Sequence, residues 1–185
     1  MKPLLEFLHH RAAVVLIHPG ELPAPQVSGI PTFTADFFVD TTRTAISLIL
    51  SSEIAQYPLI KFILAHAGGF APFIAYRILL TIRSTKNKAL QALALLDQER
   101  QMPRQLGVLK QFYDEVALSS TGAALPSLLE VAHPVHITYG SDFPSAPAPA
   151  VSFIAEQYAK QPMESTLRYG IHRGNAEALF RRLKI

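Results

Sequence analysis

Residues 61–69, KFILAHAGG, decide the fold, because an apolar run there ends on a histidine that two glycines follow at once. The run shows no polar alternation, which is typical of a parallel strand that is covered on both faces. Gly68 and Gly69 allow a tight turn, and Pro72 suits the first turn of a helix. The stretch therefore predicts a buried strand that delivers His66 to a site.

Two other stretches repeat this pattern. Residues 12–20, AAVVLIHPG, end an apolar run on His18, and residues 135–144, VHITYGSDFP, place Asp142 just past a short apolar run. Folds built of parallel strands and helices carry their chemistry at the carboxyl ends of the strands. We therefore expect His18 and Asp142 to face each other across that end of the sheet, with His66 between them.

The chain alternates strand and helix four times, which implies parallel strands joined by right-handed crossovers. Four such units are half of a barrel of eight, and the pattern alone leaves a small open doubly wound sheet as the alternative. The predicted elements are a helix over 3–11, a strand over 13–17, a binding loop over 21–38, a helix from a cap at Asp40 and Thr41 to about 56, the strand before His66, a helix over 72–82, a helical hairpin over 84–104, a helix from 103 to about 112, a strand over 114–119, a helix over 123–132, the strand before Asp142, and closing helices, the last capped by Asn175.

Composition limits the class of protein. A chain of 185 residues with 49% hydrophobic residues predicts one domain over residues 1–185 with a sizeable core. The net charge of +3 comes from scattered Lys and Arg, which predicts no nucleic-acid partner. Cysteine is absent, so disulfides and thiolate metal sites are excluded. Charged residues interrupt the apolar start, and no run is long enough to cross a membrane, so we expect a cytoplasmic protein without a membrane partner.

Five short motifs follow one another along the chain: His18-Pro19, 40–43 (DTTR), 66–69 (HAGG) with Pro72 and Arg77, 140–144 (GSDFP) and 174–180 (GNAEALF). In their order and spacing they resemble the amidohydrolase-related decarboxylases, the group that includes aminocarboxymuconate semialdehyde decarboxylase and the salicylate- and resorcylate-type decarboxylases. The resemblance covers nearly all of this chain and the second half of the family's barrel. It implies an α/β fold, a partial TIM-type (β/α) barrel of about the last four βα units.

The resemblance also implies roles for the three strand-end residues. His18 and Asp142 map on metal ligands, His66 maps on a catalytic histidine that polarises substrate or activates water, and Asp142 is also catalytic as a proton shuttle. The implied cofactor is a divalent metal ion, with zinc expected first and manganese second. The implied activity is a carbon–carbon lyase, a decarboxylase of a small aromatic or unsaturated carboxylic acid. Hydrolysis of a lactone or an amide uses the same parts and remains the alternative.

One feature of the family is missing. Its first strand carries a further ligand pair, His or Glu, then one residue, then His, and this sequence has no such pair. A catalytic metal normally takes at least three protein ligands. Either a second chain completes the barrel, so that the protein is a homo-oligomer, or the chain is a non-catalytic remnant of a longer ancestor.

Each candidate residue also has a purely structural interpretation. His18 could be an ordinary strand-end histidine, His66 a packing residue beside the glycine turn, and Asp142 the N-cap of the helix that follows. Arg77 is either a carboxylate anchor or a solvated helix residue. For the remaining late histidines the structural interpretation is the expected one, and these are His133, His136 and His172.

Overall fold

The computed structural model describes residues 2–22, 27–84, 107–180 and 182. Four parallel strands form one sheet in the order β1-β2-β3-β4. Apart from Ser84, the predicted helical hairpin over 84–104 lies outside the described residues, as does the start of the helix predicted from 103. Among the described helices, none has both the length and the apolar character that a membrane crossing requires.

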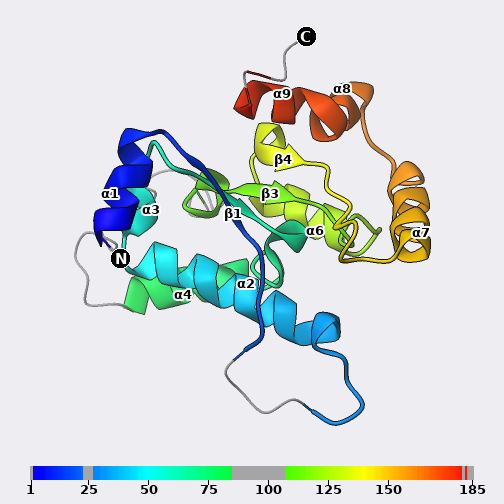
Figure 1. Ribbon diagram of the computed structural model, residues 1–185, viewed down its shortest axis with the longest axis horizontal. Helices are drawn as coiled ribbons and strands as arrows, with labels where there is room; N and C mark the ends of the chain where they lie inside the picture. Colours follow the sequence, from blue (N-terminus) through cyan, green and yellow to red (C-terminus); the bar gives the residue numbers. More distant parts are fainter. Residues whose placement is uncertain (1, 23–26, 85–106, 181, 183–185) are drawn as a thin grey trace.

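Helices lie around the sheet and connect its strands (Figure 1). The short helices α8 and α9 lie together near the C-terminus, whereas α1 and α3 lie together at the other side of the view. The strands are β1 (Val14–Ile17), β2 (Lys61–Leu64), β3 (Tyr113–Glu115) and β4 (Ile137–Thr138). The helices are α1 (Lys2–His10), α2 (Thr32–Leu50), α3 (Glu53–Gln56), α4 (Ala75–Ser84), α6 (Ala124–Val131), α7 (Ala148–Ala159), α8 (Ser165–Tyr169) and α9 (Asn175–Leu179).

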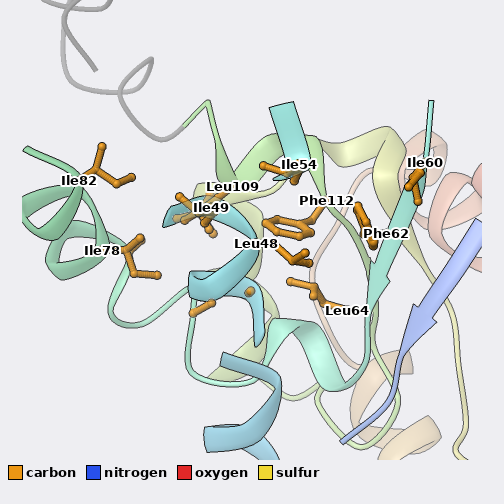
Figure 2. Close-up of a cluster of buried hydrophobic side chains, with 14 of the residues drawn as sticks. Leu48, Ile49, Ile54, Ile60, Phe62, Leu64, Ile78, Ile82, Leu109 and Phe112 are labelled. Carbon is orange, nitrogen blue, oxygen red and sulfur yellow. The ribbon is translucent and has the colours of Figure 1, made fainter. Parts of the chain in front are cut away.

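The main core lies between β2 and the helices that pack on its outer face. Alternate residues of a strand point to opposite faces, and Phe62 and Leu64 both point toward these helices. They belong to one buried cluster with Leu48 and Ile49 of α2 and Ile78 of α4, which Figure 2 shows. A second cluster of buried side chains joins α6 to β4 and to the closing helices, and it comprises Ala67, Val116, Leu125, Leu128, Ala132, Ile137, Tyr158 and Ile171.

Helix α2 corrects the prediction of a long binding loop. The loop was expected over 21–38 with a helix cap at Asp40, but α2 already begins at Thr32, just after Pro31. Phe33 and Phe37 are one helical turn apart, and this spacing extends the helix toward the N-terminus. The Asp40 carboxylate instead accepts a hydrogen bond from the Gly20 N–H at 2.9 Å.

The loop after β2 is fastened to α2 by a threonine hydroxyl. Thr42 Oγ1 donates to the Phe38 carbonyl oxygen at 2.6 Å and accepts from the Phe70 N–H at 2.8 Å. Gly69 lies at the same contact with φ +64°, and a Cβ at this position would collide with the Phe38 carbonyl oxygen. The close approach of the loop to α2 therefore requires glycine here.

Several predicted boundaries were wrong for local reasons. The helix predicted to reach residue 56 ends at Leu50, because Ser52 adopts a left-handed backbone with φ 62°, and α3 then starts afresh. The strand predicted over 114–119 is only β3, since Leu118 is also left-handed at φ 52°. The helix predicted from Pro72 begins at Ala75, after a turn.

The predicted cap at Asn175 was also wrong. Residue Gly174 occupies the N-cap position of α9, and no side chain caps that helix. The Asn175 amide is buried, and its nitrogen donates to the carbonyl oxygens of Pro134 at 2.9 Å and Ile137 at 2.7 Å. Asn175 therefore ties the closing helices to the start of β4.

Candidate metal centre

Three loops at the carboxyl end of the sheet carry the candidate side chains. His18 directly follows β1, His66 lies two residues after β2, and Asp142 lies four residues after β4. Because all four strands are parallel, these loops meet at one edge of the sheet. The topology alone therefore brings together residues that are 124 positions apart in the chain.

The three side chains converge closely. His18 Nε2 lies 3.3 Å from Asp142 Oδ1, and the rings of His18 and His66 meet edge to face at 5.4 Å between centroids. One ligand atom from each of the three residues lies within 4.8 Å of the others. His18 and Asp142 face each other as the sequence predicts, but they touch directly, and His66 lies beside the pair rather than between its members. The chemical roles of these residues stay predictions.

Backbone carbonyl groups orient both imidazole rings. His18 Nδ1 lies 3.1 Å from the Pro19 carbonyl oxygen, and His66 Nδ1 lies 3.1 Å from the Ala117 carbonyl oxygen. A carbonyl oxygen only accepts hydrogen bonds, so each Nδ1 carries the proton. In the neutral rings, each Nε2 then keeps its lone pair, and a backbone contact of this kind fixes the tautomer that ligates metals.

Glu115 holds His66 in place, and the sequence did not single this residue out. Its Oε1 accepts from the His66 N–H at 2.9 Å, and its Oε2 accepts from the Ala117 N–H at 2.8 Å. Its carboxylate also fills the space that a Cβ at Gly140 would need. The sequence did offer a signal. Glu115 and Asp114 are adjacent acidic residues on a strand, and because side chains alternate along a strand, one of the two must face the opposite side of the sheet from the other.

The backbone is left-handed at two of the candidate residues. His66 has φ 54° and Asp142 has φ 60°, a conformation that residues other than glycine adopt rarely. Such backbone strain clusters at functional sites. The helix-cap interpretation of Asp142 does not hold, because Pro147 occupies the N-cap of α7.

A cavity of about 520 Å³, here called the metal cavity, opens beside the three residues. Aromatic side chains of α2 form much of its wall, so the segment predicted as a binding loop does reach the site, but as a helix. The volume falls within the range of small-molecule sites. The lining residues are His18, Phe33, Phe37, Phe38, His66, Leu118, Asp142, Ser145, Ala146, Pro147 and Ala150.

The donor set fits a divalent transition metal. Two imidazole nitrogens and one carboxylate oxygen are the ligand types that zinc and manganese sites use. The closest pair of donor atoms, His18 Nε2 and Asp142 Oδ1, lies at hydrogen-bonding distance, and a bound cation would take the place of the proton between them. So few donors would leave coordination positions of an ion open, which is the arrangement of catalytic rather than structural sites.

The other histidines lie away from this centre. The ring of His136 stacks on Tyr113 at 4.0 Å between centroids, and its Nδ1 lies 2.9 Å from the Lys110 carbonyl oxygen. The ring of His172 packs on Tyr158 at 5.0 Å. These contacts agree with the structural interpretation of both residues. Arg77 is exposed on α4 and is not among the residues that line the metal cavity.

Comparison with known proteins places these features in a family. The family model described as amidohydrolase matches residues 2–182. A protein named 6-methylsalicylic acid decarboxylase, from Penicillium expansum, is 32% identical over an alignment of 193 positions, which covers 99% of this chain and 54% of that protein. The chain thus spans about half the length of the curated relatives that it matches.

Solved structures confirm the predicted fold class. A crystal structure named amidohydrolase II is 28% identical with a TM-score of 0.80, and the match covers 96% of this chain and 55% of that one. The dihydroxybenzoic acid decarboxylase of Polaromonas sp. JS666, solved with manganese and the inhibitor 2-nitroresorcinol, has a TM-score of 0.72 over 99% of this chain and 54% of its own. At 18% identity this second likeness concerns the fold alone. The described strands and helices form a partial (β/α) barrel.

Proposed function

This chain belongs to the amidohydrolase family, and on that premise we propose that it takes part in the metal-dependent decarboxylation of a small aromatic carboxylic acid. We propose further that residues 1–185 act as one domain. The observation that carries the proposal is the convergence of His18, His66 and Asp142 within 4.8 Å beside an aromatic-lined cavity. The relative that acts on 6-methylsalicylic acid supports the substrate class.

The proposed ligands are His18 through Nε2 and Asp142 through its carboxylate, with His66 at the edge of the centre. A divalent ion supplies positive charge that grips the substrate carboxylate and an adjacent hydroxyl. Manganese in a structural relative supports that ion, and the imidazole donors suit zinc equally well, so the experiment below compares the two.

The protein residues supply the proton and the orientation. Asp142, in its acid form, donates a proton to the ring carbon that carries the carboxylate. The electron pair of the carbon–carbon bond then returns to the ring as carbon dioxide leaves, and Asp142 regains a proton from water. His66 Nε2, which has a lone pair because Nδ1 faces Ala117, accepts a hydrogen bond from the substrate's phenolic hydroxyl. The Phe38 ring lies tilted against His66 at 6.0 Å between centroids and gives the substrate an apolar neighbour on this side.

Metal titration tests the ligand assignment. We expect the metal-free protein to bind one Mn²⁺ or Zn²⁺ per site by calorimetry, and Asp142→Asn and His18→Gln to weaken binding at least about 100-fold, because each removes a ligand. His10→Gln is the matched control, since His10 is an exposed histidine outside the site. The loaded protein is then assayed for carbon dioxide release from 6-methylsalicylic acid. Metal uptake without release would favour the hydrolase alternative, and no uptake would favour the non-catalytic remnant.

We also propose that a second copy of the chain covers the open edge of β1. In the described part of the chain β1 is an edge strand, and Leu16 on it is 55% exposed. An uncovered apolar edge strand favours association. We expect light scattering to report a dimer or larger species, and Leu16→Lys to shift it to monomer. Leu4→Lys is the control, because Leu4 is 57% exposed on α1. A monomeric wild type would contradict the proposal.

A further inference from the structure

Glu115 lies between two of the loops that carry candidate site residues. It is the last residue of β3, and β3 lies between β2 and β4 in the sheet. On one side, its carboxylate accepts a hydrogen bond from the N–H of His66 in the loop after β2. On the other side, it packs against Gly140 in the loop after β4, which also carries Asp142. One side chain therefore contacts both loops.

Three hydrogen bonds join Glu115, Ala117 and His66 into a closed ring. Glu115 Oε1 accepts from the His66 N–H at 2.9 Å, and Oε2 accepts from the Ala117 N–H at 2.8 Å. The Ala117 carbonyl oxygen, in turn, accepts from His66 Nδ1 at 3.1 Å. Hydrogen bonds to a carboxylate are stronger than those between neutral groups. The carboxylate therefore fixes the backbone of His66 directly and its imidazole ring through Ala117.

The backbone at His66 needs such a support. His66 and Ala67 are both left-handed, with φ 54° and 55°, and neither is glycine. Residues hold this conformation only where surrounding contacts impose it. Because His66 is buried, water cannot readily replace the protein acceptors of its N–H and Nδ1. The orientation of the ring therefore depends on Glu115.

Gly140 makes room for the Glu115 carboxylate. A Cβ at Gly140 would overlap Glu115 Oε2 and lie 2.9 Å from Glu115 Cδ, whereas its next neighbour, Ala117 Cβ, is at an ordinary contact distance of 3.6 Å. The φ angle of Gly140 lies outside the left-handed region, so alanine can adopt this backbone conformation. Gly140→Ala would therefore act on the Glu115 carboxylate and leave its other neighbours in place.

We propose that Glu115 is a positioning residue for His66, which keeps the proton on Nδ1 and leaves the Nε2 lone pair available to the metal cavity, and that Gly140 is required for this role. The inference rests on the proposed function, because there His66 Nε2 accepts the hydrogen bond of the substrate hydroxyl. The tautomer itself is a property of the metal-free chain and can be measured without turnover.

Nitrogen-15 NMR of the imidazole rings in the metal-free full chain measures the tautomer of His66, and His66→Gln identifies its signals. We expect Glu115→Gln to lower the ratio of the Nδ1–H form to the Nε2–H form at least about fivefold, the loss of one net hydrogen bond. A glutamine amide has only one oxygen, so one of the two N–H groups loses its acceptor. Glu130→Gln replaces an exposed acid on α6 and should leave the ratio unchanged.

Gly140→Ala is expected to lower the tautomer ratio as Glu115→Gln does, although it removes no hydrogen-bonding group. In a Glu115→Ala background, the same glycine substitution should have no further effect, since the carboxylate that it displaces is absent. Gly20→Ala is the control, because a Cβ at Gly20 meets nothing within 4 Å. Circular dichroism checks that each variant is folded. A residue that served stability alone would change the free energy of unfolding and leave the tautomer ratio at its wild-type value.

Two results would overturn the proposal. One is a folded Glu115→Gln variant with the wild-type tautomer ratio. The other is an effect of Gly140→Ala that is as large in the Glu115→Ala background as in wild type. Because the NMR measurement needs neither metal nor turnover, its outcome is independent of the metal titration. A chain that binds no metal but shows both expected shifts would keep the positioning role of Glu115 and lose only the proposed function.

Discussion

Replacing Gly69 by alanine is expected to lower the free energy of unfolding by about 3–5 kcal/mol, at the upper end of single-residue effects. Gly69 has φ +64° and ψ −126°, a region that is essentially restricted to glycine. The added Cβ would also collide with the Phe38 carbonyl oxygen and lie 2.9 Å from Thr42 Oγ1. Because the clash is with a backbone atom and not with the end of a flexible side chain, α2 and the loop after β2 would have to move apart.

Urea unfolding measures this effect, and Gly20→Ala is the matched control. A Cβ at Gly20 meets nothing within 4 Å, and its N–H bond to Asp40 survives the substitution. We therefore expect Gly20→Ala to change the free energy of unfolding by less than about 0.5 kcal/mol. A loss below about 1 kcal/mol for Gly69→Ala would show that the contact between α2 and the loop is not tight. The wall formed by Phe38 would then be poorly defined.

The second large effect depends on pH. Burial, and secondarily the negative charge of Glu115, raise the pKa of Asp114 from 3.8 to about 7. The folded chain therefore binds a proton that the unfolded chain has released, and its stability falls as pH rises from about 4 through 7. The side chain of Asp114→Asn stays neutral at every pH. We therefore expect the free energy of unfolding of the variant, relative to wild type, to be roughly 3 kcal/mol higher at pH 8.5 than at pH 5.

The measurement is the free energy of unfolding of both proteins at the two pH values. Apolar side chains of Leu64, Phe112 and Leu128 surround a small cavity beside Asp114, and they explain why its ionised form is poorly solvated. Glu130→Gln replaces an exposed acid on α6, and its effect should not vary with pH. If the difference in free energy of unfolding between Asp114→Asn and wild type were the same at pH 5 and pH 8.5, Asp114 would not be protonated in the folded chain.

Local sequence patterns were enough to predict the strand ends that build the centre. An apolar run followed by His and Gly, or by Gly, Ser and Asp, predicts a buried strand and the turn that follows it. Parallel topology then brings His18, His66 and Asp142 together without further information. The order of the motifs predicted a family and half of a barrel, and the comparisons confirmed both.

Long-range contacts account for what the sequence did not predict. Glu115 was missed because its role is to bind the backbone of His66, 49 residues away. Asn175 was assigned as a cap because Asn is a common N-cap, but its partners lie 38 and 41 residues earlier. Helix α2 starts earlier than Asp40 because Phe33 and Phe37 belong to one helical face, which local capping rules do not weigh.

We expect His18 and Asp142 to bind one divalent ion, with His66 beside it. The most direct test of this site is a crystal of the full chain soaked in manganese chloride and measured at the manganese absorption edge. We expect one anomalous peak within coordination distance of His18 Nε2 and an Asp142 oxygen, with His66 Nε2 beside it, and no peak in Asp142→Asn crystals. A peak elsewhere, or none in wild-type crystals at saturating manganese, would contradict the account.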